Sequence, residues 1–222
     1  MKPMSGYIQE DIDPEELAHR SELASSIAGS VRELIDATVR TEVGEADIAE
    51  ARRLIEAATE ILRRDQLPGA YGIRFNSDGT KRSWGNAILG RRNPIAPPVE
   101  LHHESEFSWT EVELGAAYEG PAGLVHGGVL ALILDQLLGS TAEFQGVPGM
   151  TGTLSVRYRS ATPLGKIRGE ARVDRVEGVK TFVTGTISSN GKVSAEAEGI
   201  FILPKWARGE VSDVLRKSVG EG

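Results

Sequence analysis

The feature that most constrains the fold is a strongly apolar segment near the middle of the chain, which begins after His126 and includes the uninterrupted apolar run 129–134. The segment continues to Ala142 and is apolar nearly all round its first two helical turns, as expected for a buried helix. It is far shorter than the roughly 20 residues that a transmembrane helix needs. The sequence therefore predicts one central helix that other elements must surround.

Segments of alternating apolar and polar residues lie on both sides of this helix in the sequence, as is typical of half-buried strands. The dipeptide Asn190-Gly191 is a strong signal for a two-residue hairpin between two of them. The chain therefore predicts four or five antiparallel strands around a buried helix, which is an α+β domain. The predicted strands are Phe107 to Leu114, Thr153 to Arg159, Gly169 to Val176, Thr181 to Ser188 and Val193 to Leu203.

The first 66 residues predict a helical hairpin. Asp13 followed by Pro14 is a helix start, since the carboxylate caps the first turn and proline needs no partner for a missing N–H. Two apolar stripes then recur at helical spacing, and we expect the hairpin to lie on the main domain. The stripes are Leu17, Ala24, Ile27, Val31, Leu34 and Thr38, and then Ile48, Ala51, Ile55, Ala58 and Leu62.

The remaining boundaries follow from composition. Residues 67–106 are rich in Gly, Pro, Asn and Arg without a sustained period, which predicts a loop-rich connection with at most one short strand. Residues 107–204 form the predicted α+β domain, and 205–222 a C-terminal tail. A structureless connection this long is uncommon in a compact domain and is often functional.

Charge and cysteine content exclude several classes of function. The net charge is −7, and residues 1–65 carry all of it, with 8 Lys and Arg against 15 Asp and Glu. Such a segment is repelled by phosphate, so we expect no nucleic-acid partner. The absence of cysteine excludes disulfides and a thiol nucleophile and is typical of a reducing compartment. Without a signal-peptide pattern at the start, we expect a cytoplasmic protein with no membrane segment.

His102-His103-Glu104 resembles a metal-binding sequence. Adjacent histidines on a strand point to opposite faces, however, and no second ligand pair accompanies them. We therefore expect no metal at these residues, and we expect no cofactor.

Asp135 is the polar exception in the apolar helix. A buried carboxylate is costly unless it is hydrogen-bonded or used in catalysis, so Asp135 is either a structural or a catalytic residue. The residues that share its helical face are mostly small, which indicates that a helix, a strand or a ligand approaches closely. These residues are Gly128, Ala131, Gly139 and Ala142.

The start of the helix offers backbone donors. Gly127 and Gly128 expose N–H groups at the positive end of the helix dipole, where they can stabilise a polarised carbonyl. His126 either caps the helix, fills a core position or takes part in the chemistry. Gly127 and Asp135 are about 12 Å apart along a helix, too far to act on one carbonyl carbon. Two antiparallel copies of the helix would bring the Gly of one subunit beside the Asp of the other, so catalysis would require a dimer.

These residues as a set resemble the hotdog-fold acyl-CoA thioesterases of the PaaI-like and THEM-type group, over roughly residues 107–203. The resemblance implies a long central helix wrapped by a curled antiparallel sheet and dimerised through the sheet edges. It also implies that Asp135 is the general base or nucleophile, that Thr151 assists it, and that the Gly127 amide, beside His126, polarises the thioester from the other subunit. The motif residues are Gly120 to Gly128, Asp135, Thr151, Tyr158, Pro163 and Val176 to Lys180.

Parts of the pattern have two interpretations. Thr151 is also consistent with an ordinary threonine at the start of a strand. Lys180 matches a family position that contacts CoA phosphates, but Val179 stands where a second basic residue is common. Arg157 and Arg159 share one face of their strand, where they either contact phosphate or form a solvated edge.

The sequence therefore predicts hydrolysis of acyl-CoA thioesters by a homodimer, or by a tetramer of two dimers. One alternative is a hotdog protein that binds acyl-CoA as a sensor without hydrolysing it. Another is a hotdog enoyl-CoA hydratase or dehydratase, although the chain lacks an Asp-x-Asn-Pro-x-His segment. Ala161 and Glu119-Gly120 also depart from the family pattern, so the acyl group is left open.

Overall fold

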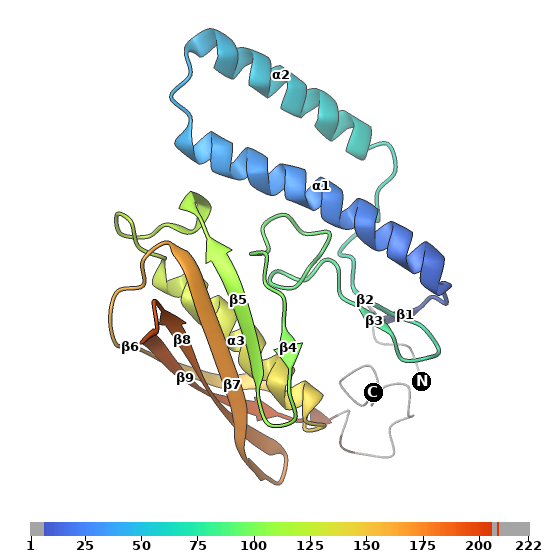
Figure 1. The fold of residues 1–222 in the computed structure, drawn as a ribbon. Coiled ribbons are helices and arrows are strands. Elements are labelled where there is room, and N and C mark those ends of the chain that lie inside the picture. Colours follow the sequence, from blue (N-terminus) through green and yellow to red (C-terminus); the bar gives the residue numbers. More distant parts are fainter. Residues whose placement is uncertain (1–6, 206–207, 209–222) are drawn as a thin grey trace.

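A computed structural model describes residues 7–205 and 208. Its main part is a six-stranded antiparallel sheet that curls around one helix, α3 (Gly127–Phe144), as Figure 1 shows. The strand order is β4-β5-β7-β8-β9-β6, with β6 at one end. The strands are β4 (His102–His103), β5 (Ser108–Leu114), β6 (Met150–Tyr158), β7 (Gly165–Glu177), β8 (Lys180–Ser189) and β9 (Lys192–Ile202). A short 3-10 helix, η1 (Ala116–Tyr118), lies between β5 and α3. The predicted hotdog architecture of class α+β is confirmed.

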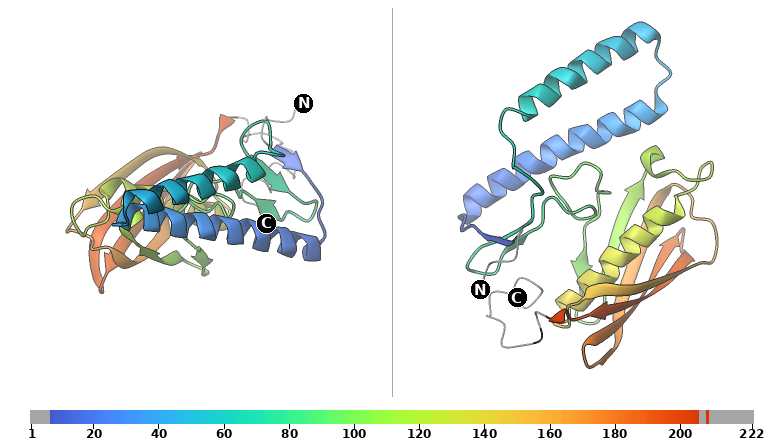
Figure 2. Two further views of the ribbon diagram at one scale, coloured as in Figure 1. Left: turned by 90° about the horizontal axis from the view of Figure 1, so that it is seen from above. Right: turned by 180° about the vertical axis from the view of Figure 1, so that it is seen from behind.

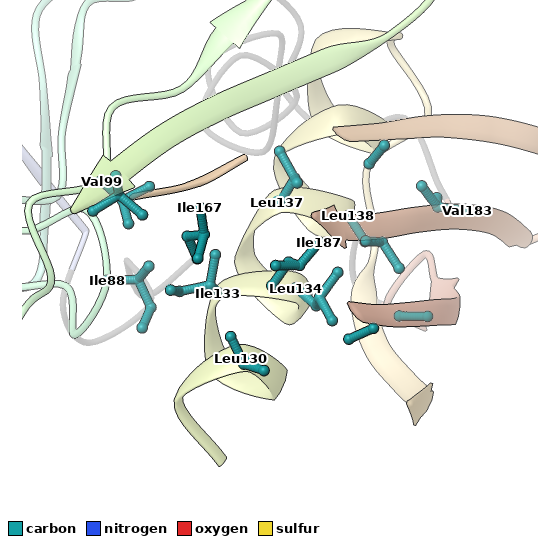
Figure 3. Packing of buried hydrophobic residues seen from close by; sticks show 14 of the residues in the cluster. Ile88, Val99, Leu130, Ile133, Leu134, Leu137, Leu138, Ile167, Val183 and Ile187 are labelled. Carbon is teal, nitrogen blue, oxygen red and sulfur yellow. The ribbon is translucent and has the colours of Figure 1, made fainter. Parts of the chain in front are cut away.

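The core forms where α3 meets the concave face of the sheet. Leu134, Leu137 and Leu138 are fully buried and face Ile187 and other inward residues of the strands (Figure 3). Burial of each such side chain contributes about 1.5–3 kcal/mol. The packing therefore fixes both the rotation of α3 about its axis and its position along the sheet, and with them the direction in which Asp135 points.

The predicted strands are confirmed, with small shifts at their ends. Asn190 has φ 51° and Gly191 has φ 74°, so the hairpin between β8 and β9 uses two left-handed residues. Asparagine and glycine adopt that conformation most readily, which explains why this dipeptide predicted the turn. The two-residue β4 extends the sheet beyond the predicted start at Phe107.

The long N-terminal helix, α1 (Pro14–Arg40), begins as predicted, because the Asp13 carboxylate accepts hydrogen bonds from the N–H groups of Glu15 and Glu16. Its contact with the rest of the protein is narrow. Ala24 and Ala28 are its only buried residues. Arg32 adds hydrogen bonds to the backbone carbonyls of Asn93 and Ala96.

The predicted apolar stripe of α1 is wrong in part, since Ile27 is 44% exposed and Leu34 is 38% exposed. The second helix, α2 (Glu45–Leu62), was predicted at its place in the sequence but has no buried residue. It lies on the side of α1 away from the sheet, as both views in Figure 2 show. The hairpin therefore rests on the main domain through α1 alone, because small side chains of α1, rather than its largest apolar ones, make the close contact.

The connection after α2 contains more structure than its composition indicated. β2 (Ile73–Phe75) pairs in parallel with β1 (Tyr7–Gln9) and antiparallel with β3 (Lys81–Arg82). Arg82 is buried and donates hydrogen bonds to the side chain of Asn76 and to the carbonyl of Glu10. The pairing of β1 with β2 joins residues more than 60 positions apart, which local sequence patterns do not reveal.

No helix within residues 7–205 and 208 is both long and apolar enough to cross a membrane. The predicted C-terminal tail, 205–222, lies outside the described residues except for Lys205 and Arg208.

Replacement of Leu137 by alanine tests the packing of α3. Leu137 has 0% exposure, so the cavity left by the substitution lowers the free energy of unfolding by about 3 kcal/mol, measured by urea denaturation. Leu54→Ala is the matched control, because Leu54 is 54% exposed on α2 and its truncation changes stability by less than about 0.5 kcal/mol. Equal losses for the two variants would contradict this description of the core.

Candidate active site

The carboxylate of Asp135 and the hydroxyl of Thr151 form the centre of the site. The Thr151 hydroxyl donates a hydrogen bond of 2.9 Å to one oxygen of Asp135, although the two residues lie on different elements, α3 and β6. Asp135 is half-buried, and its second oxygen receives no donor within the described part of the chain. One oxygen is therefore oriented by the protein and the other is left for a water molecule or a substrate.

The backbone N–H groups of Gly127 and Gly128 differ in their hydrogen bonding at the start of α3. His126 is the N-cap of α3, and its Nδ1 accepts a hydrogen bond of 3.0 Å from the N–H of Gly128. The Gly128 donor is thus already used inside the protein, and the expectation that both amides are free is wrong. The N–H of Gly127 has no acceptor among the described residues, as is usual for the first residue of a helix.

The close approach to the small face of α3 comes from the sheet. The ring of Phe201 on β9 packs against Gly139, where a Cβ atom would lie 3.2 Å from the ring. The ring of Tyr158 lies against Gly127, where a Cβ atom would lie 3.3 Å from the phenol. Of the four small residues that share a face with Asp135, Gly139 therefore lies against Phe201, whereas Tyr158 contacts Gly127, which is outside that set.

A gap separates the two halves of the site within one chain. Gly127 and Asp135 lie eight residues apart on the same helix, about 12 Å along its axis. Asp135 is held by Thr151 near the start of β6, whereas Gly127 contacts Tyr158 at its end. β6 is also the last strand of the sheet and pairs only with β9 among the described residues. One chain therefore presents two half-sites along a strand whose outer edge is unpaired.

The predicted phosphate-binding residues differ in their surroundings. Arg159 forms an ion pair of 2.7 Å with Glu196, and this guanidinium holds the pKa of the Glu196 carboxyl below its usual value. Its charge is thus already matched. Arg157 is exposed and has no ion pair in the described structure, and Lys180 is exposed at the start of β8. Of the three residues, only Arg159 forms an ion pair within the described part of the chain.

The two histidines of β4 point to opposite sides, as the strand pattern predicted. The ring of His102 stacks on Trp109 at 4.1 Å, whereas that of His103 stacks on Phe144 at 4.5 Å. Burial lowers the pKa of His103 below its usual value, which favours the neutral ring. Among residues 7–205 and 208, no group of three His, Asp or Glu side chains is arranged to hold a metal ion.

A cavity of about 910 Å³ lies beside the C-terminal half of α3, and its volume is in the range of small-molecule sites. It begins at Ser140, five residues after Asp135, and reaches Ser25 and Arg32 on α1. The sequence gives no sign of this cavity, because its walls come from α1, the 79–103 segment and α3, which only the tertiary fold brings together.

Comparisons with known proteins identify thioesterases as relatives of this chain. The family model described as "Thioesterase superfamily" matches residues 122–195, which include α3 and β6. Acyl-coenzyme A thioesterase THEM4 of Xenopus laevis is 34% identical over 91 residues, which cover 40% of this chain and 41% of that protein. Acyl-coenzyme A thioesterase THEM5 of Mus musculus is 29% identical over 148 residues, which cover 63% and 59% of the two chains. The chain thus spans less than two thirds of the length of these curated relatives.

A crystal structure of a protein described as a thioesterase superfamily protein has a TM-score of 0.73 to this structure and is 31% identical in sequence. The similarity covers 81% of this chain and 90% of that chain, so it extends beyond residues 107–203. With this agreement in both sequence and fold, the chain belongs to the thioesterase superfamily and has its hotdog fold.

Proposed function

We propose that the protein hydrolyses acyl-CoA thioesters to a free acid and CoA. The observation that carries the proposal is the hydrogen bond from the Thr151 hydroxyl to the Asp135 carboxylate, which orients one oxygen and leaves the other accessible. A carboxylate in this state can take a proton from water or attack a carbonyl carbon itself. The similarity to acyl-coenzyme A thioesterases THEM4 and THEM5 supports the choice of substrate.

The reaction needs one base and one donor to the developing oxyanion. In the general-base route, Asp135 takes a proton from water as the oxygen of that water attacks the thioester carbon. The carbonyl oxygen becomes negative and is stabilised by the free N–H of Gly127 at the positive end of α3. The carbon–sulfur bond then breaks, the proton on Asp135 passes to the leaving sulfur, and the products are the acid and the CoA thiol. In the nucleophilic route, an Asp135 oxygen attacks the thioester carbon, and the carbon–sulfur bond breaks to release the CoA thiolate and leave an anhydride. Water then hydrolyses the anhydride, which restores the Asp135 carboxylate, releases the acid and supplies the proton that the CoA thiolate takes up.

The two groups must come from different subunits. If two copies of β6 pair edge to edge about a two-fold axis, the strands run antiparallel, so the start of one lies beside the end of the other. This arrangement brings Asp135 and Thr151 of one chain toward the partner's Gly127. The 12 Å gap within one chain then becomes a short gap between chains. The proposed active form is therefore a homodimer with two equivalent sites.

The CoA phosphates need basic contacts on the protein. Lys180 and Arg157 are the proposed contacts for the CoA phosphates, and Arg159 is engaged instead with Glu196. A tetramer of two dimers and a cytoplasmic location stay predictions from the sequence.

Asp135→Asn tests the base or nucleophile. The amide is nearly the same size but neither accepts the proton nor attacks the carbonyl, so we expect kcat to fall by about 1,000-fold. Release of free CoA from a panel of acyl-CoAs, followed with a thiol reagent, measures this loss. Asp174→Asn on the exposed part of β7 is the control and keeps wild-type activity. Tight acyl-CoA binding by a wild-type protein that releases no CoA would favour a sensor, and hydration of an enoyl-CoA would favour a hydratase.

The role of Thr151 is tested by removing and then restoring its hydroxyl. Thr151→Ala loses the hydrogen bond that orients Asp135, and we expect kcat to fall about 10-fold. Thr151→Ser keeps the hydroxyl and recovers most of the rate. Thr184→Ala, on the outer face of β8, is the control and changes neither kcat nor KM. Equal rates for the alanine and serine variants would show that the hydroxyl is not needed.

The Gly127 amide is tested with a pair of substitutions that differ in one N–H group. Gly127 is the first residue of α3, where proline fits, and His126 has φ −61° and ψ 131°, which suits a residue before proline. Gly127→Pro therefore removes the donor, and we expect kcat/KM to fall about 100-fold. Gly127→Ala adds the same Cβ atom beside Tyr158 but keeps the N–H, so a much smaller loss is expected.

Mixed dimers test whether the two groups act across the subunit interface. When Asp135→Asn and Gly127→Pro chains are co-expressed in equal amounts, half of the dimers contain one chain of each kind. Each such dimer has one site with both changes and one intact site, so total activity reaches about a quarter of wild type. If Asp135 and Gly127 acted within one chain, every site would carry a change and no activity would return.

A further inference from the structure

From the contacts at the start of α3, we infer that Tyr158 is a positioning residue for the Gly127 amide. The Tyr158 hydroxyl donates a hydrogen bond of 2.8 Å to the carbonyl oxygen of Gly127, across 31 positions of sequence. The inference rests on the proposed function, because it assigns Tyr158 a part in holding the oxyanion donor of that reaction.

The helix start needs such support because its sequence is intrinsically flexible. Gly127 and Gly128 lack a Cβ atom, so their backbone dihedral angles are restricted less than those of other residues. An amide donor lowers a barrier most when it is already aimed at the developing charge and does not have to reorganise. The direction of the Gly127 N–H must therefore be imposed by its neighbours.

Three contacts restrain this turn from different sides. The N–H of His126 donates 2.9 Å to the carbonyl of Tyr118, and the N–H of Gly128 donates 3.0 Å to Nδ1 of His126. The Tyr158 hydroxyl holds the carbonyl of Gly127, which belongs to the same peptide group as the Gly128 N–H. The carbonyl of His126, on the peptide group that carries the Gly127 N–H, accepts hydrogen bonds from the N–H groups of Val129 and Leu130. The peptide groups on both sides of the Gly127 Cα are therefore restrained, while the Gly127 N–H has no protein acceptor in the described structure.

Tyr158 also belongs to the strand that holds the other half of the site. It is the last residue of β6, and Thr151, which holds Asp135, is near the start of the same strand. Because β6 contributes a hydroxyl to each half-site, the strand sets the positions of the base and of the donor together. The phenol is 52% exposed, so its loss opens no core cavity, and its hydroxyl contributes mainly through this hydrogen bond.

Tyr158→Phe tests the inference because it removes only the hydroxyl and keeps the ring against Gly127. We expect kcat on an acyl-CoA to fall about 10-fold, with KM and the midpoint of thermal unfolding close to those of the wild type. Deuterium exchange of the amides of residues 127–131 is expected to become faster, while the exchange of residues around Thr151 stays unchanged. Tyr71→Phe is the control, because the ring of Tyr71 stacks on Trp84 within the 67–106 connection. We expect this variant to keep the kcat, the KM and the amide exchange rates of the wild type.

Two double variants separate positioning from a general structural effect. His126→Ala loosens the same turn at the start of α3. We therefore expect the fold-decrease in kcat of the double variant His126→Ala/Tyr158→Phe to be smaller than the product of the two single fold-decreases. Thr151→Ala acts on Asp135 instead, so its effect and that of Tyr158→Phe multiply. If kcat of Tyr158→Phe equals that of the wild type, or if it falls only together with stability, the role of Tyr158 is wrong. If the wild-type protein releases no CoA from any acyl-CoA, the proposed function itself is wrong and this role is lost with it.

Discussion

The burial of α3 in the curled sheet is the interaction on which the rest of the structure depends. Leu134, Leu137 and Leu138 occupy the concave face of the sheet and fix the rotation of the helix. With that face buried, Asp135 lies toward β6, where a threonine hydroxyl meets its carboxylate. The geometry of the proposed active site is thus a consequence of apolar packing on the adjacent face of the same helix.

The edge strand β6 contacts both Asp135 and Gly127 and also forms one edge of the sheet. Its Thr151 and Tyr158 hydroxyls contact Asp135 and Gly127, and its outer edge is unpaired in the described chain. An unpaired edge is a template for another strand, so the proposed dimer uses for assembly the same strand that orders the proposed site. In the proposed dimer, assembly and catalysis are therefore linked through one element.

The N-terminal region contributes one wall of a cavity. Arg32 of α1 donates hydrogen bonds to the carbonyls of Asn93 and Ala96, and α1, the 79–103 segment and the end of α3 all line the cavity. Local i to i+3 and i to i+4 ion pairs such as Arg53 with Glu50 and Arg52 with Glu56 match charges along α2. The helix thereby forms without burying any side chain in the rest of the chain.

The sequence alone determined the central helix, the strands after it, the Asn190-Gly191 turn and the unusual place of Asp135, because each follows from local periodicity or from one residue in unsuitable surroundings. Tertiary structure decided which donors remain free: His126 uses the Gly128 amide, and Glu196 engages Arg159. It also decided that β1 pairs with β2, and that α1 contacts the body through alanines while α2 lies outside. These contacts depend on the distance and the direction between separate elements. A local pattern of hydrophobic residues gives no information about either.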